Sequence, residues 1–157
     1  ESPIQSSGSM RSHKELDPDF SSKYPHTILI VEDDSINAKV LQTIFKKLGY
    51  QADVADNGEA CLKALDSKEY DIIFMDLQMP VMDGYKATLK ILSSDSINHK
   101  IFITAFTAKA SQDDRDACKA VGMHDFVAKP ARPQKIVDVL NRAHSWLETA
   151  AVTTDHQ

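Results

Sequence analysis

Acidic residues follow two short apolar runs of the chain. The run at 27–31 leads into Glu32 and Asp33, and the run at 71–75 leads into Asp76. Carboxylates that share a small site repel one another, so either a pKa rises or a cation binds. Oxygen ligands suit a hard ion, and Mg²⁺ is the natural choice, with Mn²⁺ as an alternative. If the two runs are neighbouring strands, the sequence therefore predicts a divalent-metal site formed by these three carboxylates.

A threonine and a lysine follow two further apolar runs. Thr107 comes after the run at 101–106, and Lys129 comes after the run at 126–128. An ammonium and a hydroxyl could receive the charge of a phosphoryl group while a carboxylate acts as nucleophile and forms an acyl phosphate. Asp76 is the best candidate for the nucleophile because it ends the central run. Taken singly, each residue has a plainer explanation as a helix cap or turn residue, and only their coincidence favours a phosphoryl site.

Strand-like and helix-like patterns alternate five times along the middle of the chain. Strict alternation with short connections predicts a parallel sheet with helices on both faces, which is an open doubly wound α/β fold. In such folds a ligand binds outside the carboxyl ends of the strands, where the residues above are expected to meet. The predicted strands are 27–31, 51–55, 71–76, 101–106 and 126–128, and the predicted helices begin near residues 35, 58, 85, 111 and 133.

The composition is that of an ordinary acidic globular protein. Hydrophobic residues make up 42% of the 157 residues, charged residues 26%, and the net charge is −5. Binding to nucleic acid through a basic face is therefore disfavoured. No apolar run approaches the roughly 18 residues of a membrane span, which predicts no membrane contact by this chain and leaves open a membrane-anchored parent protein. Two cysteines in helix-like segments favour a reducing, cytoplasmic compartment.

The chain is predicted to hold one domain, 26–149, between two polar tails. The stretch 1–25 is rich in Ser, Pro and charge without periodicity, which is typical of a linker or a disordered tail. The stretch 150–157 is interpreted as a second tail. The histidines are scattered without metal-ligand spacing and are interpreted as surface residues: His13, His26, His99, His124, His144 and His156.

Several runs of the sequence closely resemble the response-regulator receiver family, across about 27–147. They are ILIVEDD (28–34), DIIFMDLQMPVMDG (71–84), FTA (106–108) and FVAKP (126–130). The resemblance implies a (βα)5 flavodoxin-like fold with strand order 2-1-3-4-5. It also implies a phosphoacceptor domain that catalyses its own phosphorylation and dephosphorylation in the presence of Mg²⁺. The sequence leaves open whether the parent protein is an enzyme of the hybrid histidine kinase type.

The resemblance assigns a metal site. It makes Asp76 the phosphoacceptor, and it makes Glu32 and Asp33 ligands of Mg²⁺ together with Asp76. The metal in this family also takes the main-chain carbonyl at the position of Gln78. Glu32 stands where Asp is more frequent in the family, so its longer arm is expected to serve the same purpose.

The resemblance also assigns a switch. Thr107 is expected to reorient toward the phosphoryl group, and Lys129 to form a salt bridge with it. Phe126 matches the aromatic position that turns inward when Thr107 moves, although many members have Tyr there and this chain therefore lacks a switch hydroxyl. The Lys129–Pro130 peptide bond is expected to be cis, as in relatives.

The residues of the motifs at 78–84 and 123–126 resemble receivers attached to hybrid sensor kinases more than receivers that drive a DNA-binding domain. Only about ten residues follow the last predicted helix, which predicts no output domain within this chain. The expected partners are a histidine kinase domain or a histidine phosphotransfer protein, to which Asp76 would relay its phosphoryl group. The first helix, with Ile36 and Val40, is the expected docking face. A stand-alone single-domain response regulator that acts by protein–protein interaction is the alternative.

Other protein classes with a strand-end acid fit less well. A phosphatase of the haloacid-dehalogenase type needs a second acid two residues after the nucleophile, where this chain has Gln78. A flavin carrier needs a Gly- and hydroxyl-rich phosphate loop after the first strand, where this chain has three acids that repel phosphate. An inert receiver-like scaffold is disfavoured because every acceptor-site residue is present.

Overall fold

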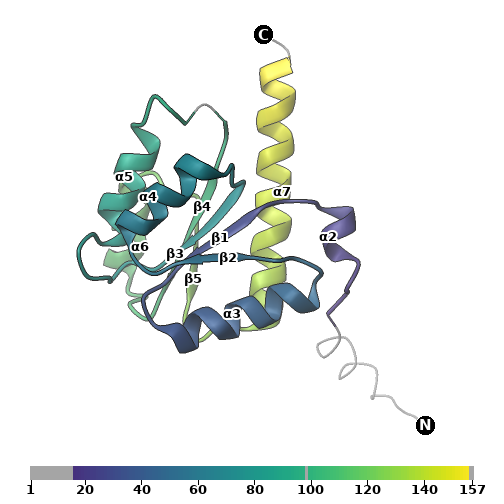
Figure 1. Ribbon diagram of the computed structural model, residues 1–157, viewed down its shortest axis with the longest axis horizontal. Helices are drawn as coiled ribbons and strands as arrows, with labels where there is room; N and C mark the ends of the chain where they lie inside the picture. Colours follow the sequence, from purple (N-terminus) through teal and green to yellow (C-terminus); the bar gives the residue numbers. More distant parts are fainter. Residues whose placement is uncertain (1–15, 98, 156–157) are drawn as a thin grey trace.

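A five-stranded parallel sheet forms the centre of the molecule in the computed structural model, which describes residues 16–97 and 99–155 (Figure 1). The strands lie in the order β2-β1-β3-β4-β5, and every neighbouring pair is parallel. The predicted fold and strand order are therefore confirmed. The strands are β1 (Ile28–Val31), β2 (Asp53–Ala55), β3 (Ile72–Met75), β4 (Phe102–Thr107) and β5 (Asp125–Ala128).

The strands next to the centre are apolar because helices cover them on both faces. All residues of β1, β3 and β4 are buried, as expected for a parallel sheet inside an α/β fold. The register pairs Ile30 with Phe74 and Val31 with Met75, so β1 and β3 end side by side. Their following residues, Glu32 and Asp76, therefore leave the sheet at the same place.

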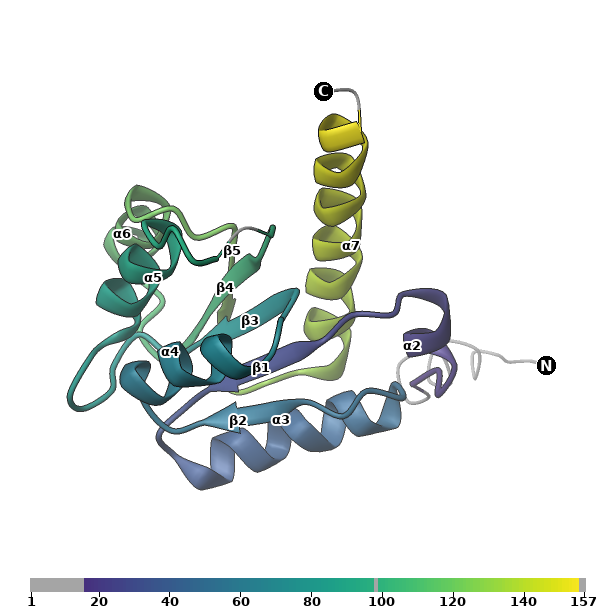
Figure 2. The same ribbon diagram turned by 45° about the horizontal axis from the view of Figure 1, so that its top comes forward.

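Two helical layers sandwich the sheet. Helices α3 and α7 pack over one face, and α4, α5 and α6 pack over the other, each with its own hydrophobic cluster (Figures 1 and 2). The helices are α2 (Phe20–Lys23), α3 (Ser35–Lys47), α4 (Gly58–Ser67), α5 (Gly84–Leu92), α6 (Gln112–Ala120) and α7 (Pro133–Asp155). None of the helices in the described part of the chain is both long and apolar enough to cross a membrane.

The N-terminal segment, residues 16–26, differs from the prediction of a linker over 1–25. It contains the short helix α2, and Phe20 is buried in the cluster beneath α3 and α7, with Tyr24 packed against that cluster. The amide of Ser21 donates to the carbonyl of Leu48 (3.0 Å), which ties the segment to the end of α3. The prediction is wrong for 16–25, because aromatic residues spaced four apart supply enough apolar surface for burial. Residues 1–15 lie outside the described part.

The C-terminal boundary also differs from the prediction. Helix α7 continues to Asp155 and stands beside the sheet with its last turns beyond it (Figure 2), so residues 150–155 of the predicted tail are helical. Residues 156–157 lie outside the described part.

The prediction that the histidines lie on the surface is wrong for the four that the structure describes, which are all partly buried. His99 Nε2 lies 3.1 Å from the carbonyl oxygen of Tyr70. His26 and His144 share a hydrogen bond between Nε2 and Nδ1 (3.0 Å), and the His26 side chain is only 9% exposed. His124 stacks on Phe102 and accepts a hydrogen bond at Nδ1 from the amide of Ile103 (3.0 Å). Burial lowers the pKa of His124. The partners lie far apart in sequence, so no local pattern announces these contacts.

Candidate functional site

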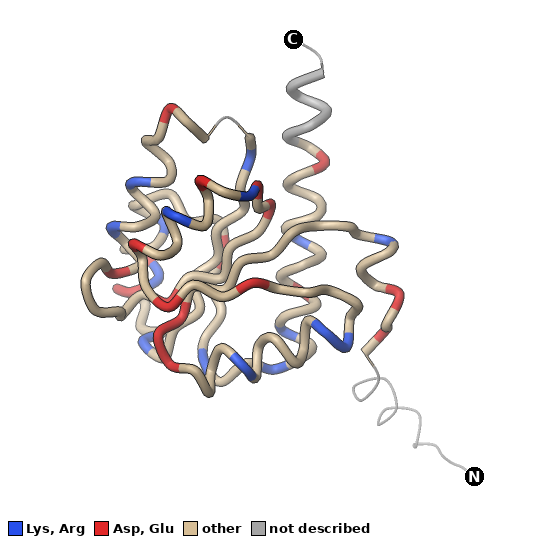
Figure 3. The backbone as a smooth tube through the Cα atoms, viewed as in Figure 1, with Lys and Arg blue, Asp and Glu red and all other residues tan. Residues whose placement is uncertain are grey.

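Three carboxylates meet where β1 and β3 end. Oxygen atoms of Glu32, Asp33 and Asp76 lie within 4.8 Å of one another. Glu32 and Asp76 are 1% and 4% exposed, whereas Asp33 is exposed. In Figure 3 a continuous acidic stretch marks the turn from β1 into α3. The predicted cluster is thus present, with two acids in the floor of the site and one at its entrance.

The ammonium of Lys129 enters this cluster from β5. Its Nζ lies 2.6 Å from Oε1 of Glu32 and 3.5 Å from Oδ2 of Asp76, and the lysine side chain is 13% exposed. The Lys129 amide donates to the carbonyl of Thr107 (2.8 Å), which fixes the strand end from which the side chain projects. The Lys129–Pro130 peptide is cis, as expected. The longer arm of Glu32 thus brings it closer than Asp76 to the lysine.

One oxygen of Glu32 keeps unused capacity to bind a cation. Oε2 accepts a hydrogen bond from the amide of Asp34 (3.0 Å), whereas the buried Oε1 accepts no aligned hydrogen bond from the described residues. The Lys129 ammonium makes an ionic contact with Oε1 at 2.6 Å. An all-oxygen set of this kind, with two buried carboxylates and one exposed, fits a hard divalent cation such as Mg²⁺.

Burial raises the pKa of Asp76 to about 7, and the nearby Glu32 adds to the rise. Lys129 and the amide of Gln78, which donates to Oδ1 (3.3 Å), act in the opposite direction. Two carboxylates therefore compete for one ammonium in a site that excludes water. A second positive charge in the site would favour the ionised form of Asp76, which is the form that can act as a nucleophile.

The remaining predicted site residues differ in how close they lie to this cluster, and Phe126 contacts α6 rather than the carboxylates. Thr107 is 1% exposed at the end of β4, and its hydroxyl accepts a hydrogen bond from the amide of Lys109 (3.1 Å). Phe126 is half-buried on β5, with the guanidinium of Arg115 4.4 Å from its ring centroid. The side chain of Gln78 is exposed, and its backbone lies beside Asp76 through the amide contact. The predicted switch of Thr107 and Phe126 stays a prediction.

Sequence reasoning missed the role of Gly84, although it lies in a quoted motif. A Cβ at this position would lie 2.2 Å from the carbonyl oxygen of Asp76, so only glycine lets the start of α5 approach the acceptor strand. Asp34 caps α3 on the other side of the site: its side chain accepts from the amides of Ile36 and Asn37. The contact of Gly84 fixes the loop between β3 and α5, and the cap of Asp34 fixes the loop between β1 and α3.

The sequence profile described as the response regulator receiver domain matches residues 28–141. The chain belongs to this family. Its relatives include hybrid signal transduction histidine kinase B of Dictyostelium discoideum, which is 35% identical over 127 residues. That match covers 74% of this chain and only 6% of the relative, so this receiver spans a small part of the curated relatives it matches.

Solved receiver structures have the same fold. The receiver domain of the sensor histidine kinase PA1611 of Pseudomonas aeruginosa, with a magnesium ion in its active-site cleft, is 34% identical, with a TM-score of 0.69 over 76% of this chain and 98% of that one. A co-crystal structure of the Saccharomyces cerevisiae histidine phosphotransfer protein Ypd1 with the receiver domain of Ssk1 gives 26% identity and a TM-score of 0.71, over 76% and 89% of the two chains. The sequence comparison and the structural comparison thus support the same family assignment.

Proposed function

We propose that this receiver takes a phosphoryl group from a phosphohistidine donor onto Asp76 and relays it to a histidine phosphotransfer protein. The observation that carries the proposal is the cluster of Glu32, Asp33 and Asp76 with the Lys129 ammonium inside it. A carboxylate nucleophile, a cation site and an ammonium are the three parts that acyl-phosphate formation needs. The parent protein is proposed to be a cytoplasmic or membrane-anchored hybrid histidine kinase, in keeping with the relatives that share this domain.

Glu32, Asp33, Asp76 and the main-chain carbonyl of Gln78 would hold Mg²⁺ in this proposal. When bound, the ion offsets the charge of the phosphoryl oxygens and keeps Asp76 ionised. The buried Oε1 of Glu32, which has no aligned hydrogen bond from the described residues, supports this assignment. Mn²⁺ has the same ligand preference and is expected to substitute.

Each remaining residue has a part in the transfer itself. An oxygen of Asp76 forms the new bond to phosphorus while the bond from phosphorus to the donor imidazole nitrogen breaks. The electron pair of that bond returns to the ring, which leaves as neutral imidazole when its other nitrogen carries a proton. Lys129, held between Glu32 and Asp76, is placed to pair with the new phosphoryl oxygens. The Thr107 hydroxyl would reorient toward the same oxygens.

The first test is covalent labelling of the whole chain. Incubation with phosphoramidate and Mg²⁺, followed by intact mass measurement, should give one base-labile phosphoryl adduct. Asp76→Asn should remove the adduct, and Asp66→Asn, at an exposed acid on α4, should retain it. An adduct that persists in Asp76→Asn would refute the assignment of the acceptor.

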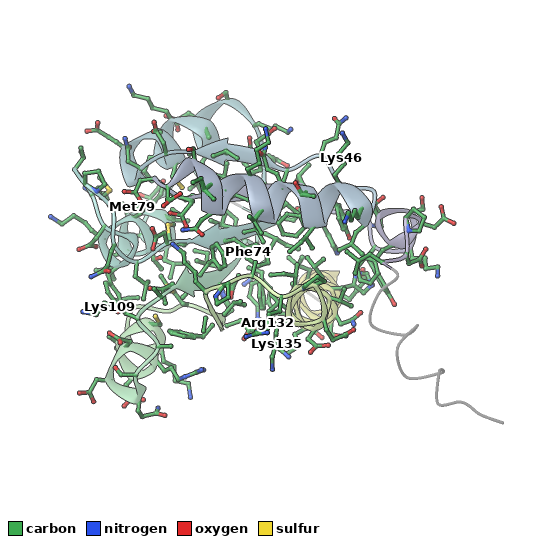
Figure 4. All side chains as sticks on the ribbon, turned by 90° about the horizontal axis from the view of Figure 1, so that it is seen from below. Lys46, Phe74, Met79, Lys109, Arg132 and Lys135 are labelled. Atoms are coloured by element: carbon green, nitrogen blue, oxygen red, sulfur yellow. The ribbon has the colours of Figure 1, made fainter. Side chains whose placement is uncertain are left out.

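The docking face for the protein donor is proposed to lie on α3. Ile36 and Val40 are 74% and 44% exposed, and they line an apolar groove with Ala131 and Pro133 at the start of α7. Figure 4 shows Arg132 and Lys135 beside this start of α7. Ile36→Glu should slow transfer from phosphorylated Ypd1 without changing labelling by phosphoramidate. Unchanged transfer from Ypd1 would exclude this face.

A further inference from the structure

Val81 has a backbone conformation that its side chain disfavours. Its φ is 72°, and it is the non-glycine residue with positive φ in the described part of the chain. Branching at Cβ makes this left-handed region especially unfavourable, because the side chain crowds the neighbouring carbonyl. The amide of Met82 donates to the carbonyl of Pro80 (2.7 Å), so Val81 is the central residue of a three-residue turn of the rare, strained kind.

The surrounding loop enforces this turn. The amide of Gly84 donates to the carbonyl of Leu77 (3.1 Å), and Gly84 lies directly against the carbonyl of Asp76. On the other side, Gly58 of α4 leaves room for Met82, whose carbonyl oxygen would be 2.9 Å from a Cβ at that glycine. The chain must therefore leave the acceptor strand and return to it within a few residues, with Val81 at the outermost point.

The side chain of Val81 gains nothing from folding that would offset this conformation. It is 76% exposed, the highest value among the exposed large hydrophobic residues of the described chain. Its loop neighbours Met79 and Met82 pack against the hydrophobic cluster, and Val81 lies outside both clusters. Asn or Gly would adopt the same backbone conformation more readily. A residue that is both strained and unpacked beside a reactive group points to a function outside the fold.

The position of Val81 suggests what that function is. Its loop follows β3, and α3 follows β1, so the two border the acceptor site from opposite sides. In Figure 4 the loop marked by Met79 lies at the end of α3 away from Lys46, which is the end that carries Ile36. Two exposed apolar residues, Ile36 and Val81, thus lie on the two segments that border the nearly buried Asp76. A small phosphodonor needs only the site, whereas a protein donor must also cover its rim.

We propose that Val81 is a specificity-determining contact for the protein partner, a histidine phosphotransfer protein whose phosphohistidine is surrounded by apolar side chains. The turn presents the two methyl groups of Val81 to that surface, opposite Ile36. Apolar contact on both rims would exclude water from Asp76 while the phosphoryl group moves. This inference rests on the proposed function of Asp76, and it adds a residue that docking on α3 alone does not include.

The test compares two phosphodonors on the full chain. Val81→Asn suits the turn and removes the methyl groups, Val81→Ile keeps an apolar branched side chain, and Leu89→Gln is a matched change at an exposed residue of α5. Transfer from phosphorylated Ypd1 should fall at least fivefold in Val81→Asn and stay within twofold in the other two variants. Labelling by phosphoramidate should stay within twofold in all three, and the Tm of Val81→Asn should equal or exceed that of the unmodified chain.

Several results would overturn the inference. Transfer from Ypd1 that is unchanged in Val81→Asn would remove the contact while leaving the function of Asp76 in place. An equal loss with both donors would mean that Val81 acts on the loop rather than on a partner. Labelling of the unmodified chain by phosphoramidate but not by Ypd1 would exclude this class of partner. Absence of any Asp76 labelling in the unmodified chain would instead refute the proposed function itself.

Discussion

The two ends of the central sheet hold different kinds of contact. At the carboxyl end, Glu32 and Asp76 are buried together and share one ammonium, that of Lys129. At the amino end, the N-terminal segment packs aromatic rings against α7: Tyr24 lies 4.3 Å from the ring of His144. The carboxyl end therefore has two buried carboxylates for one ammonium, whereas the amino end is closed by contacts that are already satisfied.

This difference separates reactivity from stability. Buried like charges cost free energy unless a cation or a proton offsets them. The carboxyl end of the sheet therefore favours binding of a cation or a proton. Buried aromatic contacts stabilise the fold without any ligand. The residues that hold the domain together should then be replaceable without loss of the chemistry, and those of the site replaceable without loss of the fold.

The largest effect is expected at Lys129. Lys129→Met keeps the length of the side chain and removes its charge, so labelling of Asp76 by phosphoramidate should slow by about 100-fold. Lys135→Met, at an exposed residue near the start of α7, is the matched control and should label normally. Initial rates from intact mass would measure both. A change below fivefold in Lys129→Met would contradict the role of the ammonium.

The N-terminal segment should show the reverse behaviour. Phe20→Ala removes a buried ring and should lower the free energy of unfolding by about 3 kcal/mol, measured by urea denaturation. The labelling rate of Asp76 should stay within twofold under native conditions. Ser22→Ala, at an exposed position of the same short helix, should leave both quantities unchanged. A small stability change for Phe20→Ala would mean that the N-terminal segment does not contribute to the stability of the domain.

Removing the acceptor charge should stabilise the fold. Burial raises the pKa of Asp76 to about 7, above the ordinary value of 3.8, so its ionisation weakens the folded state as pH rises between those values. Without added Mg²⁺, Asp76→Asn should be more stable than the unmodified chain by about 2 kcal/mol at pH 8. The difference should shrink at pH 5, where Asp76 is protonated in the folded chain. An unchanged difference at the two pH values would contradict the buried-charge explanation.

The smallest effect is expected for an ion pair at the amino end. Lys23 Nζ lies 3.0 Å from Asp17 Oδ2, a shorter distance than between Lys129 and Asp76, but both side chains are largely exposed. Solvent screens such a pair, so Lys23→Ala should leave the Tm unchanged within error. A clear drop in Tm would show that the N-terminal segment relies on charge as well as on its aromatic rings.

The fold and the acceptor cluster could be predicted from the sequence because both depend on where the strands end. β1 and β3 are apolar runs, and each is followed by an acidic residue. Because the two are neighbouring parallel strands, these acidic residues must lie close together at one edge of the sheet. The ion pair of Lys129 with Glu32 was not predicted, because the reach of a longer side chain depends on where both strands stop. Burial of Phe20 and the pair of His26 with His144 were missed because their partners are remote in sequence.

The strain at Val81 could not be predicted from residue types either. Nothing in the motif MPVMDG (79–84) forbids an ordinary turn with negative φ at valine. The left-handed conformation follows from the close approach of Gly84 to Asp76, which is a property of the folded chain. Sequence patterns carry little information about loop geometry of this kind.

Trp146 gives the amino end an optical signal of its own. It is the only tryptophan of the chain, and its ring lies 4.4 Å from that of His124 and 5.8 Å from that of Phe102. Its fluorescence therefore originates at the end of the sheet away from the acceptor. A change in emission on phosphorylation would record a rearrangement that crosses the whole sheet, and a constant emission would confine the response to the carboxyl end.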